Sequence, residues 1–231
     1  MLKVFVGFDP REALAYQVCV ASLLARSSLR LEVTPLVQAH LRAVGLYSRP
    51  ECWRGKQRWD EISQAPVSTE FALTRFLVPR LAGFAGWALY CDCDFLWRAD
   101  IAELLALTEP DKAVMLVPHD HRPEETVKMD GRLQVGYPRK NWSSLMLFNA
   151  AHAAHRNLGL ADINGRPGRA LHAFCWLEDA EIGALPEAWN WLESWSDPAI
   201  EPKAVHFTRG TPDMPGHENA AYAEEWRGYA A

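Results

Sequence analysis

Short apolar runs recur along the chain, and they are rich in β-branched and aromatic residues. The runs cover residues 2–7, 31–37, 87–91, 113–118, 144–148 and 203–207. Runs of this length and composition are typical of strands. The run at 87–91 contains no charged residue, so we expect it to form a buried strand that ends at Asp92.

Between several of these runs, apolar residues recur every three or four positions, as they do on the buried face of a helix. This spacing predicts helices at residues 11–26, 69–81, 101–107 and 150–157. Asp9 and Pro10 suit the cap and the first turn of the first helix. Strands that alternate with helices predict an α/β fold, with a mostly parallel central sheet flanked by helices.

Two segments lack a clear period. Residues 40–66 are interrupted by glycine and proline, and residues 119–142 are polar, so we expect both to be irregular. A loop as long as the second is usually functional or mobile. Neither an internal repeat nor a change in composition divides the 231 residues, which predicts a single domain over residues 1–231.

The composition is that of a soluble protein, with 49% hydrophobic and 23% charged residues. The net charge of −5 argues against nonspecific binding to nucleic acid. No apolar run approaches the roughly 20 residues of a membrane span, and the first residues do not resemble a signal peptide. The five cysteines lack paired zinc spacing, so we expect reduced, packed thiols. We therefore predict a cytoplasmic protein without a membrane span.

The clearest candidate chemistry is the pair Asp92 and Asp94 after the buried strand. Side chains two residues apart in an extended segment point to the same face, so both carboxylates can address one cation such as Mg²⁺ or Mn²⁺. The alternative is a solvated turn, because this spacing is common by chance. His206 ends another apolar run, where it either completes an Asp/Asp/His site or packs as a core histidine.

Other polar and aromatic residues allow two interpretations each. Arg209 and Gly210 follow His206 in a stretch whose backbone N–H groups suit a phosphate. The acids Glu178 and Asp179 either act in a site or begin a helix, where they favour its dipole. Three tryptophans either stack on a sugar ring or belong to the core, and these are Trp189, Trp191 and Trp195.

Taken in order, these motifs resemble those of family-8 retaining glycosyltransferases of the GT-A type. The resemblance covers residues 3–25, 67–107, 141–150, 174–192 and 203–212 in outline. It implies a single GT-A-type, Rossmann-like domain. Asp92 and Asp94 match the metal-binding D-x-D of the family, and His206 matches the histidine that completes its metal site.

The resemblance also implies which residues contact the donor. Those that would contact the nucleotide, the diphosphate or the sugar are Phe8, Asp9, Arg11, Arg75, Asn141, Ser143, Ser144, Arg209 and Gly210. Either Glu178 or Asp179 would lie under the reacting anomeric carbon. The closing motif differs from the family pattern, because it is one residue longer and lacks the lysine, whose place Arg209 would take.

The resemblance implies a metal-dependent hexosyltransferase that moves a sugar from a nucleotide-diphosphate sugar, most simply a UDP-sugar, to a glycan, lipid or protein acceptor with retention. Mn²⁺ or Mg²⁺ would be the cofactor. Front-face attack and a covalent intermediate both remain open. The alternatives are a sugar nucleotidyltransferase, which the single glycine after the first strand disfavours, and a non-catalytic nucleotide- or glycan-binding module.

Overall fold

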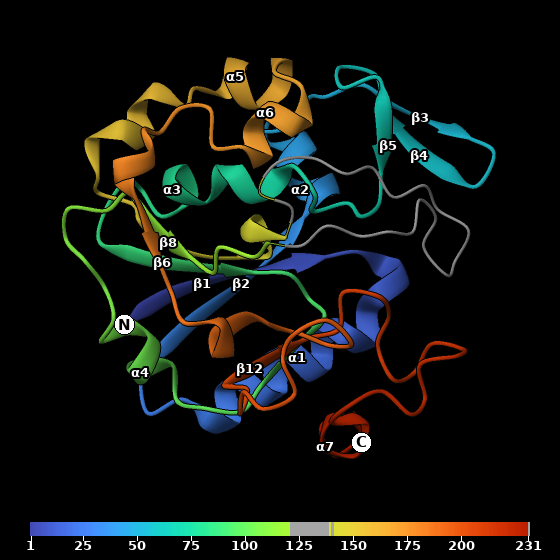
Figure 1. Ribbon diagram of the computed structural model, residues 1–231. Helices are drawn as coiled ribbons and strands as arrows, with labels where there is room; N and C mark the ends of the chain where they lie inside the picture. The colour runs from blue at the N-terminus through green and yellow to red at the C-terminus, as the bar shows by residue number, and fades with distance from the viewer. Residues whose placement is uncertain (121–138, 140, 231) are drawn as a thin grey trace.

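The computed structural model describes residues 1–120, 139 and 141–230, and its centre is a six-stranded sheet (Figure 1). From edge to edge the strands are β10 (Ile182–Ala184), β8 (Val114–Leu116), β9 (Leu145–Asn149), β6 (Trp87–Cys91), β1 (Leu2–Phe8) and β2 (Leu31–Val37). Strand β9 is antiparallel to both neighbours, and the other pairs are parallel. The prediction of an α/β fold with a mostly parallel sheet is confirmed.

Alternate residues of the central strands enter two hydrophobic cores, one on each face of the sheet. In β6, Ala88 and Tyr90 belong to the first core, and Leu89 and Cys91 belong to the second. The first core packs against α2 (Gln38–Ala43), α3 (Val78–Leu81), α5 (Leu160–Gly165) and α6 (Gly168–His172), and the second packs against α1 (Ala13–Arg26) and α4 (Ile101–Leu105). Helices therefore flank both faces of the sheet (Figure 1).

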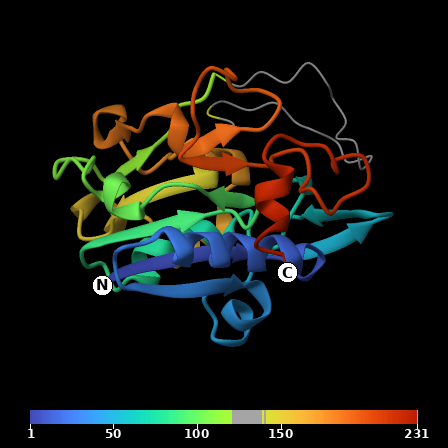
Figure 2. The ribbon, with the colours of Figure 1, turned by 90° about the horizontal axis from the view of Figure 1, so that it is seen from below.

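A second, three-stranded sheet lies on the α1 side. It consists of β11 (Trp191–Leu192), β12 (Ala204–His206) and β7 (Phe95–Trp97). Of the three tryptophans in question, Trp189 and Trp191 are buried in the core, whereas Trp195 is 40% exposed. Figure 2 shows α7 (Ala223–Arg227) beside α1, where Glu225 forms an ion pair with Arg26.

The expectation of an irregular segment at 40–66 is wrong. This part of the chain contains α2 and a small antiparallel sheet of β3 (Glu51–Arg54), β4 (Gln57–Asp60) and β5 (Ala65–Val67). Arg49 and Asp60 form an ion pair with fully buried side chains, and Arg49 also donates to the carbonyls of Ile163 and Arg166 in the α5 region. Contacts distant in sequence thus fix a segment whose local pattern is weak.

Several predicted helices are shorter than their sequence pattern. Over residues 69–81 the structure has only the 3₁₀ turn η2 (Thr74–Leu77) and α3, and over 11–26 a 3₁₀ turn, η1 (Pro10–Glu12), precedes α1. The remaining 3₁₀ turns are η3 (Trp142–Ser144), η4 (Ala153–Asn157), η5 (Asp179–Glu181) and η6 (Glu187–Asn190). Most of the loop predicted at 119–142 lies outside the described residues. Within the described part of the chain, no helix is both long and apolar enough to cross a membrane.

Candidate metal and nucleotide site

Asp92, Asp94 and His206 come together where the central sheet meets the β11–β12–β7 sheet. The two acids follow β6, and His206 ends β12, where it pairs with Phe95 of β7. One potential ligand atom from each of the three side chains lies within 4.8 Å of the others. His206 Nε2 is 3.4 Å from Asp94 Oδ1. The structure thus forms the three-residue cluster that the sequence predicts.

Asn190 determines which nitrogen of His206 faces the acids. Its Oδ1 is 3.0 Å from His206 Nδ1, and its Nδ2 donates to Ser144 Oγ at 2.9 Å and approaches the carbonyl of Asn141 at 3.5 Å. The carbonyl oxygen of Asn141 can only accept, so the NH₂ group of Asn190 must face it. The amide oxygen of Asn190 then faces His206. Nδ1 of His206 then donates to Asn190, and Nε2 is the ring nitrogen that faces Asp94. Metal-binding histidines are oriented by the same kind of contact.

The carboxylate of Asp92 is held by two side chains. Tyr90 donates its hydroxyl hydrogen to Asp92 Oδ1 at 2.6 Å, and Arg75 Nη1 lies 3.0 Å from the same oxygen. Arg75 Nη1 also donates to the carbonyl of Ser143 at 2.7 Å. Burial raises the pKa of Asp92 above its ordinary value, and the nearby charge of Arg75 opposes this rise only in part. Asp92 is therefore fixed in position next to Asp94.

A third acid, Glu12, lies near Asp94 and Cys93. Burial raises the pKa of Glu12 to about 7, and the neighbouring charge of Asp94 adds to this rise. Glu12 Oε2 accepts a hydrogen bond from Cys93 Sγ at 3.2 Å. Several acids held close together favour a cation, and two carboxylates with one imidazole form a donor set that suits Mn²⁺ or Mg²⁺. The residues present therefore fit a divalent cation.

The predicted nucleotide loop lies at the same end of the sheet as the acid cluster, because Val6 near the end of β1 pairs with Cys91 at the end of the parallel strand β6. Asp9 is buried, and its carboxylate accepts hydrogen bonds from the backbone N–H and the guanidinium of Arg11 and from the backbone N–H of Glu70. Phe8 packs edge-on against Tyr16 with ring centroids 5.3 Å apart. Asp9 and Arg11 thus hold the shape of this loop, and their contact with a nucleotide stays a prediction.

The Asn141–Ser144 segment lies at the start of β9, directly beside the end of β6. The backbone N–H of Asp92 donates to the carbonyl of Ser144 at 2.8 Å. Ser143 and Ser144 are buried in a 3₁₀ turn, whereas the sequence places Ser144 in a strand. Asn141 has a φ of 65°, a left-handed conformation that asparagine adopts more readily than most residues. Both hydroxyl groups of the turn are hydrogen-bonded within the protein, Ser143 Oγ to His172 and Ser144 Oγ to the carbonyl of Asn141 and to Asn190.

Arg209 and Gly210 follow β12 in the loop after His206. The N–H of Gly210 donates to the carbonyl of Phe207 at 3.0 Å, so a phosphate in this loop would have to use other groups, such as the guanidinium of Arg209. A Cβ atom on Gly210 would lie 2.7 Å from Cδ2 of His217. That close approach of the imidazole requires glycine at this position.

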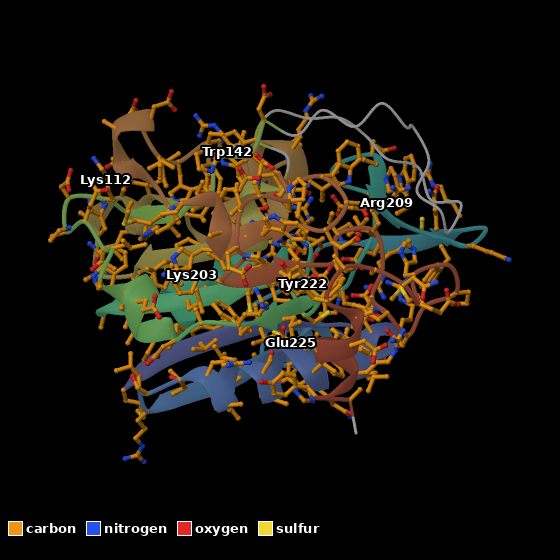
Figure 3. All side chains as sticks on the ribbon, turned by 60° about the horizontal axis from the view of Figure 1, so that its bottom comes forward. Lys112, Trp142, Lys203, Arg209, Tyr222 and Glu225 are labelled. Atoms are coloured by element: carbon orange, nitrogen blue, oxygen red, sulfur yellow. The ribbon has the colours of Figure 1, made fainter. Side chains whose placement is uncertain are left out.

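The acidic pair Glu178 and Asp179 does not lie with the cluster. Both side chains are exposed, and Asp179 forms an ion pair with Arg139. The backbone N–H of Ala113, just before β8, donates to the carbonyl of Glu181, whereas Asp92 follows the carboxyl end of β6. Lys112 donates to the carbonyl of Ala180, and Figure 3 shows Lys112 at the opposite end of the molecule from Arg209. A catalytic role for this pair stays a prediction that the geometry does not support.

Two residues that sequence reasoning missed are Asn190 and His172. Ser143 Oγ and His172 Nδ1 are hydrogen-bonded at 2.7 Å, and Asn190 connects Ser144 to His206. Neither residue belongs to a local pattern. The one signal in the sequence is that Asn190 is a polar residue between two buried tryptophans.

Solved structures of glycosyltransferases share this fold. The structure matches the WbbM bifunctional glycosyltransferase with a TM-score of 0.64 and 13% identity, covering 100% of this chain and 49% of WbbM, so the chain spans about half of that protein. It matches the galactosyltransferase LgtC, solved in complex with donor and acceptor sugar analogs, with a TM-score of 0.59 and 15% identity over 99% of this chain and 95% of LgtC. The chain therefore has the fold of GT-A-type glycosyltransferases.

The sequence identifies the family more closely. The chain is 46% identical to Protein CDI of Arabidopsis thaliana in an alignment of 229 positions that covers 97% of this chain and 84% of that protein. The chain belongs to the family of Protein CDI. No protein-family model matches it.

Proposed function

We propose that the protein is a glycosyltransferase that moves a sugar from a nucleotide-diphosphate sugar, a UDP-sugar in the simplest case, to a hydroxyl group of a glycan, lipid or protein acceptor. The observation that carries this proposal is the cluster of Asp92, Asp94 and His206 at the carboxyl end of β6 within a GT-A-type fold. Ligands of such sheets bind at the carboxyl ends of the strands. A cytoplasmic location, as predicted from the sequence, is part of the proposal.

Asp92, Asp94 and His206 would hold Mn²⁺ or Mg²⁺. When bound, the cation supplies Lewis acidity toward the diphosphate leaving group and a template for its oxygens. Asn190 keeps Nε2 of His206 directed at the cluster, and Arg75 holds Asp92. Arg75 and Arg209 add fixed positive charge for the charge that develops on the diphosphate.

We also propose transfer with retention by front-face attack. The acceptor oxygen bonds to the anomeric carbon on the face from which the diphosphate departs, the bond from that carbon to the phosphate oxygen breaks, and a phosphate oxygen takes the acceptor's proton. The remote position of Glu178 and Asp179 supports this route over a covalent intermediate on either acid. Phe8, Asp9 and Arg11 would border the nucleotide.

Binding of UDP together with Mn²⁺ is expected to raise the melting temperature by about 5–10 °C. Ligand at 100 times its Kd stabilises by roughly 2.7 kcal/mol, and a chain of this size gains about 2–4 °C for each kcal/mol. A thermal-shift panel of nucleoside diphosphates and nucleotide-sugars, each with and without Mn²⁺ or Mg²⁺, measures this effect. No shift with any of them would contradict the proposal.

The products of turnover separate the proposed reaction from its alternatives. Incubation with the nucleotide-sugar that gives the largest shift should release free UDP and either the hydrolysed or the transferred sugar. Release of pyrophosphate would instead identify a sugar nucleotidyltransferase. Binding without turnover of any donor would favour a non-catalytic module.

Replacing Asn190 with Leu is expected to weaken Mn²⁺ binding about 10- to 100-fold, because loss of the group that orients a metal-binding histidine has this effect. Asn190→Asp keeps an acceptor for His206 Nδ1 and should retain most of the affinity. Calorimetric titration of Mn²⁺ measures both, with Asn157→Leu in an exposed turn as the control. Equal affinity in the Leu and Asp variants would show that Asn190 does not act through His206.

A further inference from the structure

Ser143 and His172 form a pair that the proposed chemistry does not yet use. Ser143 Oγ lies 2.7 Å from His172 Nδ1, and this hydrogen bond joins η3, just before β9, to the last residue of α6. The ring of Phe76 meets the imidazole edge-on, with ring centroids 5.2 Å apart at 77°. The imidazole is thus held by a hydrogen bond at one nitrogen and by an aromatic ring at its side, and the residue keeps part of its surface exposed.

This pair is connected to the acid cluster by a short series of contacts. The carbonyl of Ser143 accepts from Arg75 Nη1 at 2.7 Å, and the same Nη1 lies 3.0 Å from Asp92 Oδ1. In a nucleotide-diphosphate sugar, the sugar is attached to the phosphate farther from the nucleoside. If the diphosphate binds at the cluster, its sugar must therefore lie within a few bond lengths of the cluster, and the contacts through Arg75 place Ser143 and His172 near the cluster.

The charge state of His172 suits a sugar. Burial and the nearby positive charge of Arg75 lower the pKa of His172 to about 3, so the imidazole is neutral near pH 7. A neutral imidazole has one N–H donor and one acceptor nitrogen, and a sugar hydroxyl both donates and accepts. An uncharged ring also adds no positive charge beside an anomeric carbon that becomes positive during transfer. A lysine or a protonated histidine at this position would oppose the reaction.

We propose that His172 and Ser143 form the sugar-binding side of the site, in which the imidazole edge of His172 hydrogen-bonds a hydroxyl of the donor sugar and Ser143 holds the imidazole in place. This inference rests on the proposed function. It assigns sugar recognition to His172 of α6 and Ser143 of η3, rather than to the acidic pair Glu178 and Asp179. Ser143 acts here as a positioning residue, and His172 makes the contact.

The experiment compares the affinities for UDP and for UDP-hexoses in the presence of Mn²⁺, measured by calorimetry on the wild type, His172→Phe and Ser143→Ala. His172→Phe should leave the Kd for UDP within about twofold and weaken the preferred UDP-hexose about 10-fold, since one hydrogen bond contributes roughly 1 kcal/mol and each 1.4 kcal/mol is tenfold. Ser143→Ala should also lower the affinity for the UDP-hexose, but by a smaller factor. His40→Phe, at an exposed position on α2, is the matched control.

The outcomes separate this inference from the proposed function. Equal losses for UDP and UDP-hexose in His172→Phe, or no loss for either, would overturn the sugar-binding assignment while the nucleotide site stands. A wild type that binds every UDP-hexose no more tightly than UDP would overturn it as well. A wild type that binds neither UDP nor any nucleotide-sugar with Mn²⁺ would remove the proposed function, and this inference with it.

Discussion

Replacing Asp94 with Asn is expected to abolish Mn²⁺-dependent binding of UDP and to lower the rate of sugar transfer by about 10³-fold or more. The variant keeps the shape of the side chain but removes one of the two anionic ligands beside His206. A bound cation contributes several kcal/mol of charge stabilisation, and about 1.4 kcal/mol corresponds to a tenfold change in rate. Calorimetry with UDP and Mn²⁺, together with initial rates of UDP release, measures both effects.

Asp94 is a better position for this test than Asp92. Asp92 interacts with Arg75 and Tyr90, so its loss would also leave a buried guanidinium without its carboxylate. Asp111→Asn is the matched control, because Asp111 is 71% exposed and pairs with Lys112, which lies at the opposite end of the molecule from Arg209 (Figure 3). Unchanged affinity for UDP, with and without Mn²⁺, in both the Asp94 and Asp92 variants would falsify the metal site.

The sequence predicts the central strands well, because their signal is local. The run at 87–91 forms β6 over the same residues, and the run at 31–37 forms β2. A strand that is apolar on both faces must pack against another element on each face. One of these elements is α1, which the helical spacing at 11–26 predicts. The order of strands in the sheet is not encoded in any one segment, so it required the structure.

The sequence does not predict the small β3–β4–β5 sheet, because its strands are short and partly polar. Their positions depend on pairs that no local spacing rule links, such as Arg49 with Asp60 and Arg58 with Glu70. The predicted helix at 69–81 is shorter for a related reason. Residues 71–78 are all buried, so tertiary packing on every side outweighs the one-sided pattern of an amphipathic helix.

The acid cluster was predictable because each member ends an apolar run, and the ends of neighbouring strands meet. The residues that surround the cluster could not be predicted from the sequence. Asn190 contacts His206, 16 residues away, and His172 contacts Ser143, 29 residues away, and no spacing rule links either pair. The catalytic role of Glu178 and Asp179 stays a prediction, and it rests on a resemblance over a short segment whose two acids are exposed and do not lie with the cluster.

Replacing Asp60 with Asn is expected to lower the free energy of unfolding by about 3–5 kcal/mol, because breaking a buried ion pair leaves the other charge uncompensated. The side chains of Asp60 and Arg49 are fully buried, and Arg49 also connects β4 to one carbonyl within α5 and to another just after it. At about 2–4 °C for each kcal/mol, the melting temperature should fall by roughly 6–20 °C. Differential scanning calorimetry at pH 7 measures the change.

The same pair predicts how stability depends on pH. Burial alone would raise the pKa of Asp60, but hydrogen bonds from Arg49 and Ser63 outweigh burial and lower the pKa below its ordinary value of 3.8. A carboxyl whose pKa is lower in the folded state stabilises the fold above pH 3.8, and this contribution is lost as the pH falls through the lowered pKa. The difference in melting temperature between the wild type and Asp60→Asn should therefore be constant from pH 7 to pH 5 and shrink below about pH 4.

Asp162→Asn removes an exposed pair with Arg166 and should cost less than about 1 kcal/mol, so an equal loss in both variants would show that the buried pair has no special role.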